Sequence, residues 1–214
     1  MGRPIGTECD GVDAVLNLGA GLDTRPYRME LPASLQWVEV DLPGILDYKE
    51  GVLGGSAPVC GLERVRLDLS DLTARRALFA RLAQASSRAV VVTEGLLLYL
   101  SPDEVASLAR DLAALPRFRT WIIDLASPGL VKMMNAQGGD MVAAAGAPFK
   151  FAPPEGPAFF TPLGWKPAQV TSLLKTAGRL KRLPMFLKLI SLLPEPPKPS
   201  PTRPWSAVVR LDRA

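Results

Sequence analysis

The sequence predicts an α/β fold built on a doubly wound, mostly parallel sheet. Short apolar or alternating runs recur along the chain, segments of helical periodicity separate them, and a Gly-Ala-Gly turn closes the first run. Such an alternation favours parallel neighbouring strands joined by right-handed crossovers. The 214 residues are enough for one domain with a substantial core. We therefore expect a single domain over residues 1–214.

Seven runs have the composition of strands. Ala14–Leu18 is apolar and leads into the glycine turn, and Ala89–Thr93 is apolar or β-branched throughout, as a central parallel strand should be. The other runs alternate or are rich in β-forming residues. They are Gln36–Asp41, Arg64–Leu69, Thr120–Leu125, Arg179–Leu183 and Trp205–Leu211.

Helical segments are expected between these runs. The clearest helix start is Ser101–Glu104, with a serine N-cap, a proline at the first helical position and a glutamate at the third. Further helices are expected over Pro43–Glu50, after Leu72, from Pro128 and over Lys166–Ala177. Residues 137–162 are rich in Gly, Ala and Pro. A connection of that length is usually functional or mobile, so we expect a substrate-covering insertion there.

The amino-acid composition limits the kinds of catalytic and metal chemistry that the chain can perform. The chain has no histidine, which removes the commonest general base and the commonest metal ligand. Cys9 and Cys60 form neither a close pair nor a framework, so no disulfide or metal site is predicted. No run approaches the roughly 20 apolar residues of a membrane span, and the N-terminus lacks a signal-peptide pattern, which predicts a cytoplasmic protein.

The charge of the chain is unevenly distributed. Its net charge of +4 comes from basic residues that gather after Lys166. A site for an anionic partner is one interpretation of this asymmetry. We favour a solvated surface, because no aromatic residues or nucleic-acid motif accompany these charges, and no nucleic-acid partner is predicted.

Candidate ligand contacts follow the first two strands. In a doubly wound sheet, ligands bind beyond the carboxyl ends of the strands, near the point where strand order reverses. Gly19 and Gly21 would let the backbone approach a ligand, and Asp41 lies about 20 residues further on, where an acidic side chain accepts hydrogen bonds from a ribose. These residues predict a nucleoside-containing ligand. Asp23 would repel a pyrophosphate but could face the ammonium of a methionine moiety; the alternative is that Asp23 caps a helix and Asp41 merely ends a strand.

Further candidates follow the third and fourth strands. Asp68 could offer a carboxylate to an adenine amino group and Leu69 an apolar surface to its ring; the alternative is that Asp68 only starts a helix at Ser70. Glu94 follows an apolar run, so we expect it to be buried at the floor of the cleft and to have a functional role. Tyr99 could line the acceptor side, or belong to the core. Glu94 and Tyr99 are the catalytic candidates.

These residues lie in segments that resemble the leucine carboxyl methyltransferase and polyketide O-methyltransferase superfamily, especially its bacterial branch of S-adenosylmethionine-dependent methyltransferases. Several segments in order make the resemblance specific. They are Leu16–Arg28 (LNLGAGLDTRPYR), Trp37–Pro43 (WVEVDLP), Leu67–Leu69 (LDL), Thr93–Leu100 (TEGLLLYL), Asp124–Gly129 (DLASPG) and Arg203–Leu211 (RPWSAVVRL).

The resemblance implies a Rossmann-like class I methyltransferase fold with a seven-stranded sheet and S-adenosyl-L-methionine as cofactor. It implies contacts of Gly19 and Gly21 with the methionine part, Asp41 with the ribose, Asp68 and Leu69 with the adenine, and Glu94 beside the sulfonium. Members of the family usually carry several dozen residues before the first strand, which cover the cofactor. Only thirteen precede Ala14 here, so the N-terminal helical cover is expected to be largely missing.

Methyl transfer from a sulfonium is an in-line displacement, so an enzyme contributes mainly by holding acceptor and methyl close together in a dry site. A carboxylate acceptor needs no base, whereas a phenol would need Glu94, Asp124 or Tyr99. We expect an O-methyltransferase whose acceptor is a small molecule, polyketide-like or carboxylate-bearing. The alternative is a truncated, catalytically silent cofactor-binding or interaction module. A nicotinamide-dependent dehydrogenase is disfavoured, because Thr24 is too large and Asp103 replaces the lysine of a Tyr-x-x-x-Lys pair.

Overall fold

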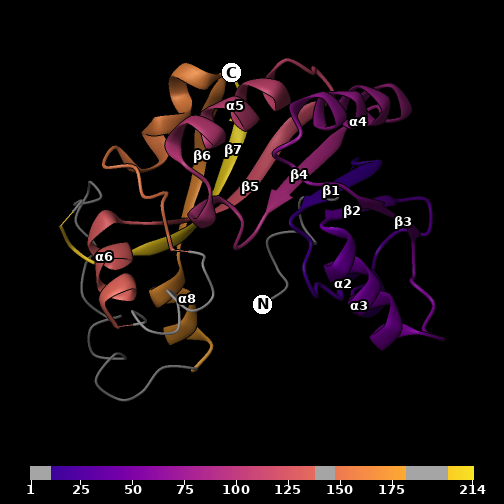
Figure 1. Ribbon diagram of the computed structural model, residues 1–214, viewed down its shortest axis with the longest axis horizontal. Helices are drawn as coiled ribbons and strands as arrows, with labels where there is room; N and C mark the ends of the chain where they lie inside the picture. Colours follow the sequence, from indigo (N-terminus) through magenta and orange to yellow (C-terminus); the bar gives the residue numbers. More distant parts are fainter. Residues whose placement is uncertain (1–10, 138–147, 182–201) are drawn as a thin grey trace. The chain divides into compact units, whose positions relative to one another are not determined.

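The computed structural model describes residues 11–137, 148–181 and 202–214 (Figure 1). Within them, seven strands form one sheet in the order β3-β2-β1-β4-β5-β7-β6. The strands are β1 (Ala14–Leu18), β2 (Gln36–Asp41), β3 (Gly61–Arg66), β4 (Ala89–Thr93), β5 (Phe118–Ala126), β6 (Trp165–Ser172) and β7 (Ser206–Arg213). The predicted mostly parallel, doubly wound α/β fold is confirmed, with β1 parallel to both β2 and β4, and β2 parallel to β3.

Helices connect the strands. The α-helices are α2 (Arg25–Arg28), α3 (Pro43–Leu53), α4 (Leu72–Ala85), α5 (Pro102–Ala113), α6 (Pro128–Gln137) and α8 (Leu173–Arg179), and the 3-10 helices are η1 (Leu97–Tyr99) and η2 (Gly156–Leu163). No helix among the described residues is long and apolar enough to cross a membrane. Part of the predicted insertion, residues 138–147, lies outside the described residues, as does Cys9.

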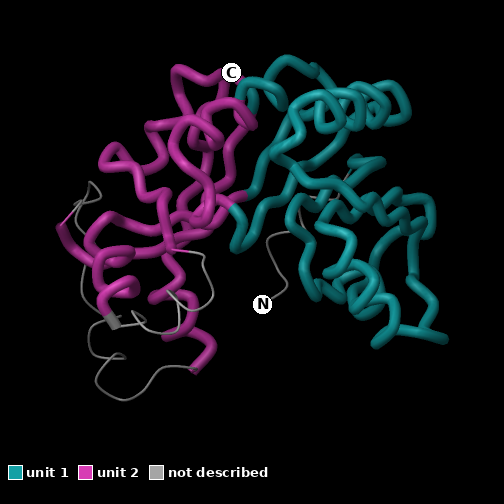
Figure 2. The backbone as a smooth tube through the Cα atoms, in the orientation of Figure 1, with its two compact units in different colours: residues 1–96, 110–122, 213 teal, residues 97–109, 123–212, 214 magenta. Residues whose placement is uncertain are grey.

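The chain divides into two compact units (Figure 2). The first comprises residues 1–96, 110–122 and 213, and the second residues 97–109, 123–212 and 214. The boundary falls inside β5, so this one strand contributes to both units.

In the first unit, α2 and α3 lie on one side of β1–β3 and α4 lies on the other (Figure 1). Alternation along β2 explains this arrangement, because successive side chains point to opposite faces of the sheet. Trp37 and Glu39 face α2 and α3, while β4 is buried at every position. On α4, Phe79 meets Phe118 edge to face at 6.0 Å, and Arg75 forms a buried ion pair with Asp111.

In the second unit, the helix start predicted at Ser101 is confirmed. The Ser101 N–H donates to Glu104 Oε2 at 2.6 Å, and the Glu104 N–H donates to Ser101 Oγ at 3.3 Å, which is a reciprocal capping box. Trp165 at the start of β6 donates its indole N–H to the carbonyl of Ala109 at 3.0 Å. Ser127 caps α6, accepting from the Leu130 N–H at 3.1 Å.

Three predicted elements differ from the structure. The third strand runs over Gly61–Arg66 and not Arg64–Leu69, because Gly61 aligns with Gln36 at the start of β2. The helix predicted over Lys166–Ala177 is wrong, because its first half is strand β6. A strand at the end of the sheet tolerates Pro167, which has no N–H to donate, and the helix starts only at Leu173.

The strand predicted over Arg179–Leu183 is also wrong where the structure describes it. Arg179 is the last residue of α8, Leu180 follows as its C-cap, and residues 182 and 183 lie outside the described residues. The final strand is confirmed as β7, and the other predicted strands and helices lie where the sequence placed them, within a few residues at their ends.

Candidate functional site

The strand order reverses at β1, whose two neighbours are β2 and β4. The register is level at this point, since Leu18 of β1 aligns with Val40 of β2 and with Thr93 of β4. The next residue along each strand is Gly19, Asp41 or Glu94. We call these three residues the end rung. A ligand in a doubly wound sheet binds beyond this edge.

The glycine turn leaves β1 with two residues in the left-handed region. Gly19 has φ +65° and Gly21 φ +49°. The N–H groups of Gly19 and Ala20 both donate to the carbonyl of Val40, at 2.8 and 3.2 Å, which binds the turn to β2. A Cβ on Gly19 would lie 3.1 Å from a Leu96 methyl, whereas one on Gly21 would meet nothing within 4 Å. Gly21 therefore presents open backbone.

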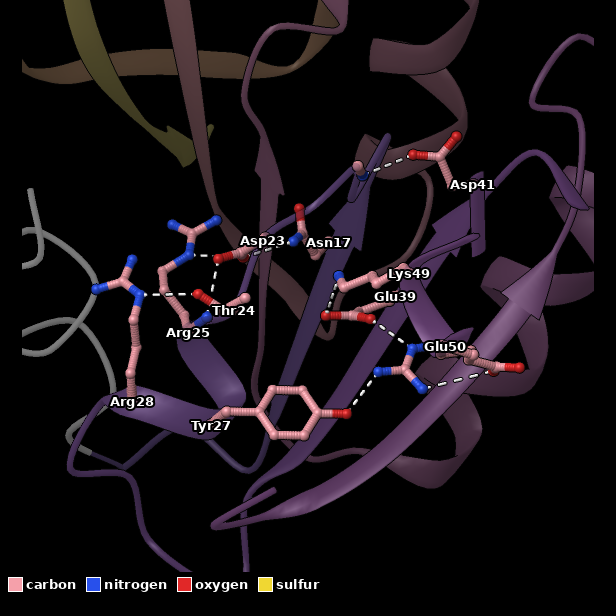
Figure 3. A network of polar contacts seen from close by, with 12 residues as sticks. Asn17, Asp23, Thr24, Arg25, Tyr27, Arg28, Glu39, Asp41, Lys49 and Glu50 are labelled. Atoms are coloured by element: carbon pink, nitrogen blue, oxygen red, sulfur yellow. Dashed lines mark hydrogen bonds and ion pairs between the residues drawn. The ribbon is translucent and has the colours of Figure 1, made fainter. Parts of the chain in front are cut away.

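Asp41 closes against this turn. Its Oδ2 accepts the Gly21 N–H at 2.7 Å (Figure 3). Its Oδ1 accepts the Leu42 N–H at 2.7 Å. Each carboxylate oxygen carries further lone pairs, so both keep the capacity to accept from a ligand. The structure thus brings together Gly21 and Asp41, as the sequence predicted.

Asp23 is occupied within the protein. Its Oδ2 accepts from Asn17 Nδ2 at 2.9 Å and from Arg25 Nε at 2.7 Å, and its Oδ1 accepts the Arg25 N–H at 2.9 Å (Figure 3). Its side chain is 13% exposed. The alternative that Asp23 caps a helix is met only in part: the N-cap of α2 is Thr24, whereas Asp23 accepts the N–H of Arg25, the first residue of that helix.

Glu94 differs in burial from the sequence expectation. Its side chain is 48% exposed, and Oε2 pairs with Arg25 Nη2 at 2.8 Å. The expectation of a buried carboxylate is wrong because β4 ends at Thr93 and the chain then turns at Gly95, with φ +69°. Glu94 is therefore beyond the buried layer while still on the end rung.

Arg25 was missed by sequence reasoning. Its side chain is 6% exposed, it pairs with Asp23 as well as Glu94, and its guanidinium lies 5.6 Å from the Trp37 ring centre. A single buried arginine leaves no periodic signal. Its position two residues after Asp23, at the first position of α2, was the available clue.

Asp68 and Leu69 follow β3 in a turn. The Leu67 N–H donates to the carbonyl of Asp41 at 3.0 Å, which places this turn beside the end of β2. Asp68 Oδ1 accepts the Ser70 N–H at 2.9 Å, and this backbone hydrogen bond lowers the pKa of Asp68. Asp68 is not the cap of α4, because that role belongs to Asp71, which accepts the Ala74 N–H.

Tyr99 belongs to the second unit and is not a core residue. It ends η1, its side chain is exposed, and its ring lies 5.3 Å from that of Phe149. The N–H groups of Lys150 and Phe151 donate to the carbonyl of Leu98, which holds this segment against η1. Asn135 also bonds both backbone groups of Phe149.

A second feature missed by the sequence is a buried ionic cluster beneath α2 and α3. Glu39 is fully buried; Lys49 Nζ lies 2.8 Å from its Oε1, and Arg64 Nε donates to its Oε2 at 3.0 Å (Figure 3). The Tyr27 hydroxyl accepts from Arg64 at 2.6 Å. The Lys49 contact is an ion pair outside hydrogen-bond geometry. Glu39 is two residues before Asp41, so the cluster stabilises β2, the strand that carries Asp41.

The side chains of the end rung suit an organic ligand that carries hydrogen-bond donors. Two carboxylates, Asp41 and Glu94, stand on either side of an open glycine turn at the ends of neighbouring strands. Carboxylates accept from hydroxyl and ammonium groups. Among the described residues, no group of three or more cysteine, aspartate or glutamate side chains could hold a metal ion.

Comparisons with known proteins agree with this geometry. A family model described as leucine carboxyl methyltransferase matches residues 7–113. A protein of Parafrankia sp. (strain EAN1pec) is 39% identical over 107 residues, covering 49% of this chain and 34% of the relative. One of Frankia alni is 33% identical over 161 residues, covering 73% of this chain and 55% of the relative. Both bear the name "Putative S-adenosyl-L-methionine-dependent methyltransferase". The chain thus spans from about a third to about half of the length of these relatives.

A solved structure supports the fold. The S-adenosylmethionine-dependent methyltransferase of Anabaena variabilis ATCC 29413 superimposes with a TM-score of 0.60 at 10% identity, over 99% of this chain and 84% of that one. At this identity the likeness concerns the fold alone. The family model covers half of the sequence. The chain therefore belongs to the leucine carboxyl methyltransferase family, and its seven-stranded sheet is that of the class I methyltransferases.

Proposed function

We propose that this protein is an S-adenosyl-L-methionine-dependent methyltransferase that methylates an oxygen of a small-molecule or carboxylate acceptor. The observation that carries the proposal is the contact between Gly21 and Asp41, which sets an acidic side chain against an open glycine turn at the reversal of strand order. Family membership and the names of the relatives give it further support.

The residues of the end rung fit this cofactor. Asp41 would accept hydrogen bonds from the ribose hydroxyls, and the open face of Gly21 would border the methionine part. The turn of Asp68 and Leu69, bonded to the end of β2, would receive the adenine. Glu94, half-exposed beyond β4, would face a cationic group.

The bound cofactor would supply a methyl group on a sulfonium: the acceptor oxygen would bond to the methyl carbon in line while the carbon–sulfur bond breaks and S-adenosylhomocysteine leaves. The protein's contribution is to bind and orient the two reactants. No histidine is available to remove a proton, and Glu94 already pairs with Arg25. An acceptor that is ionised at neutral pH, such as a carboxylate, needs no base. We therefore favour a carboxylate acceptor over a phenol.

The acceptor side is proposed to include Tyr99. It forms an exposed aromatic pair with Phe149, whose backbone is clamped by Asn135. Such a pair suits an apolar or planar acceptor, as a polyketide-like compound would be. Residues 137–162, which contain Phe149, remain our candidate for a substrate-covering insertion.

A single domain over 1–214 also remains a proposal, supported by β5, which runs through both units.

Calorimetry with S-adenosylhomocysteine tests the cofactor assignment. Asp41→Asn keeps an oxygen that can accept the Gly21 N–H but removes the charge, so we expect an affinity loss of about tenfold or more, as for hydrogen bonds to charged groups. Asp47→Asn on α3 is the control, because Asp47 pairs only with Arg66 in an exposed ion pair among the described residues. Equal affinities for Asp41→Asn and wild type would refute the ribose contact.

A turnover assay tests whether the protein transfers the methyl group to an acceptor. We expect S-adenosylhomocysteine to accumulate when the protein is incubated with the cofactor and a panel of carboxylic acids. Phenols of similar size form the comparison panel, and we expect them to react more slowly. Binding without turnover on either panel would instead support the alternative of a silent cofactor-binding module.

A further inference from the structure

Arg25 connects two carboxylates from different segments, Asp23 in the turn between β1 and α2 and Glu94 directly after β4. Its Nε donates to Asp23 Oδ2 at 2.7 Å, and its Nη2 pairs with Glu94 Oε2 at 2.8 Å. The side chain is almost fully buried and lies against the Trp37 ring. A planar guanidinium held on three sides has little freedom, so the two carboxylates are fixed relative to each other.

The two carboxylates differ in what they can still bind. Asp23 already accepts three hydrogen bonds, one from Asn17 and two from Arg25, and is largely buried. Glu94 has one oxygen on Arg25, and its side chain is 48% exposed. Glu94 is therefore the carboxylate of this pair that is placed to receive another donor.

The charges of this group are unbalanced. Asp23 and Glu94 carry two negative charges and Arg25 carries one positive charge, so the group as a whole is anionic. Such a group at the edge of a sheet favours a cationic ligand group within reach of Glu94. An amino acid ammonium meets this requirement.

We propose that Arg25 is a positioning residue, which holds the Glu94 carboxylate beside the glycine turn so that Glu94, and not Asp23, receives the ammonium of the cofactor's methionine part. The inference rests on the proposed function, because it concerns the same site. Asp41 then binds the nucleoside, and the Asp23–Arg25–Glu94 group binds the amino acid end of the cofactor.

Two ligands separate this role from a merely structural one. S-adenosylhomocysteine carries the amino acid end, whereas 5′-methylthioadenosine has the same nucleoside and thioether without it. We expect Arg25→Met to weaken S-adenosylhomocysteine binding about tenfold, in line with the loss of a charge-assisted contact, and to change methylthioadenosine binding less than about twofold. Arg28→Met is the matched control, because Arg28 is exposed on the same helix and bonds Thr24.

For Glu94→Gln we likewise expect S-adenosylhomocysteine binding to weaken about tenfold and methylthioadenosine binding to change less than about twofold. This side chain is half-exposed, so the variant keeps the test available even if Arg25→Met does not fold. Because both substitutions act on one contact, the double variant should lose no more affinity than the stronger single variant. Arg25→Lys, whose ammonium cannot bridge two carboxylates as a guanidinium does, should lie between wild type and Arg25→Met.

The outcomes are distinguishable. Equal losses for both ligands would show that Arg25 only stabilises the fold, and unchanged binding of both would show that the group is not part of the site; either result overturns the inference and leaves the cofactor assignment intact. If wild type binds neither ligand, the proposed function itself fails.

Discussion

The backbone N–H of Gly21 and the carboxylate of Asp41 lie 2.7 Å apart although 20 residues separate them in the sequence. The contact joins the turn after β1 to the end of β2, and a second bond holds Asp41 to the Leu42 N–H. The acidic group is thus fixed in position by the protein's own backbone, which lowers the cost of ordering it when a ligand binds.

The two glycines of the turn should respond differently to alanine. Both have positive φ, so each Gly→Ala change costs about 1–2 kcal/mol of backbone strain. At Gly19 the new methyl also approaches Leu96 at 3.1 Å, which adds a packing cost of about 1 kcal/mol or more. Urea unfolding should show a larger loss of stability for Gly19→Ala. Gly21→Ala should weaken S-adenosylhomocysteine binding, because the open face of Gly21 is proposed to border the methionine part. A larger loss of stability for Gly21→Ala than for Gly19→Ala would contradict the geometry described for the turn.

The buried cluster around Glu39 should be sensitive to loss of its charge. Glu39→Gln leaves Lys49 buried without a counter-ion, so we expect a loss of about 3–5 kcal/mol in the free energy of unfolding. Glu63→Gln breaks the exposed pair with Arg81 and should cost at most about 1 kcal/mol. Similar losses in the two variants would mean that Lys49 finds water or another partner.

Asp13 should contribute to stability in a pH-dependent way. Its partial burial acts to raise its pKa, but the N–H groups of Arg88 and Ser87 together outweigh this, so the pKa lies below its ordinary value. A carboxylate with a lowered folded-state pKa stabilises the fold above its unfolded pKa of about 4, and this contribution is lost as the pH falls through the folded value. Urea titrations between about pH 6 and 3 should show a shallower acid decline for Asp13→Asn. Asp103→Asn, at an exposed position of α5, is the comparison, and identical declines in both variants would rule out the linkage.

Cys60 should be protected from thiol reagents in the folded protein. Burial, together with the negative charge of Glu39, raises the pKa of the Cys60 thiol. Since the thiolate is the reactive form, modification should be slow in buffer and fast in urea. The measurement belongs in a Cys9→Ser background, which leaves Cys60 as the one thiol of the chain. Fast labelling of the native protein would show that Cys60 is accessible.

The sequence was sufficient where one local pattern determines an element. The β-branched run Ala89–Thr93 and the capping residues Ser101 and Glu104 gave β4 and the start of α5 correctly. It failed where tertiary position decides. Lys166–Ser172 forms an edge strand despite a helix-compatible pattern, and the start of β3 is set by its pairing with β2.

The same distinction applies to the candidate site. The position of Asp41 beside the glycine turn could be predicted, because its spacing from the glycines follows from the length of one strand–helix–strand unit. Arg25 could not, since its role depends on Glu94, about 70 residues later, and on Trp37 of the neighbouring strand. The exposure of Glu94 likewise depends on the turn at Gly95.

The level register of β1, β2 and β4 has a consequence for how this protein tolerates insertions and deletions. Removing one residue within any of these strands would draw its end back by about 3.3 Å and turn the following side chain to the opposite face, which would take Asp41 or Glu94 out of line. Residues added further along, beyond the glycine turn after β1 or beyond the contacts of Asp41 and Glu94, lengthen a loop and leave that line intact. Relatives that keep the residues of the end rung should therefore differ in length after these strand ends and keep the strands themselves free of gaps.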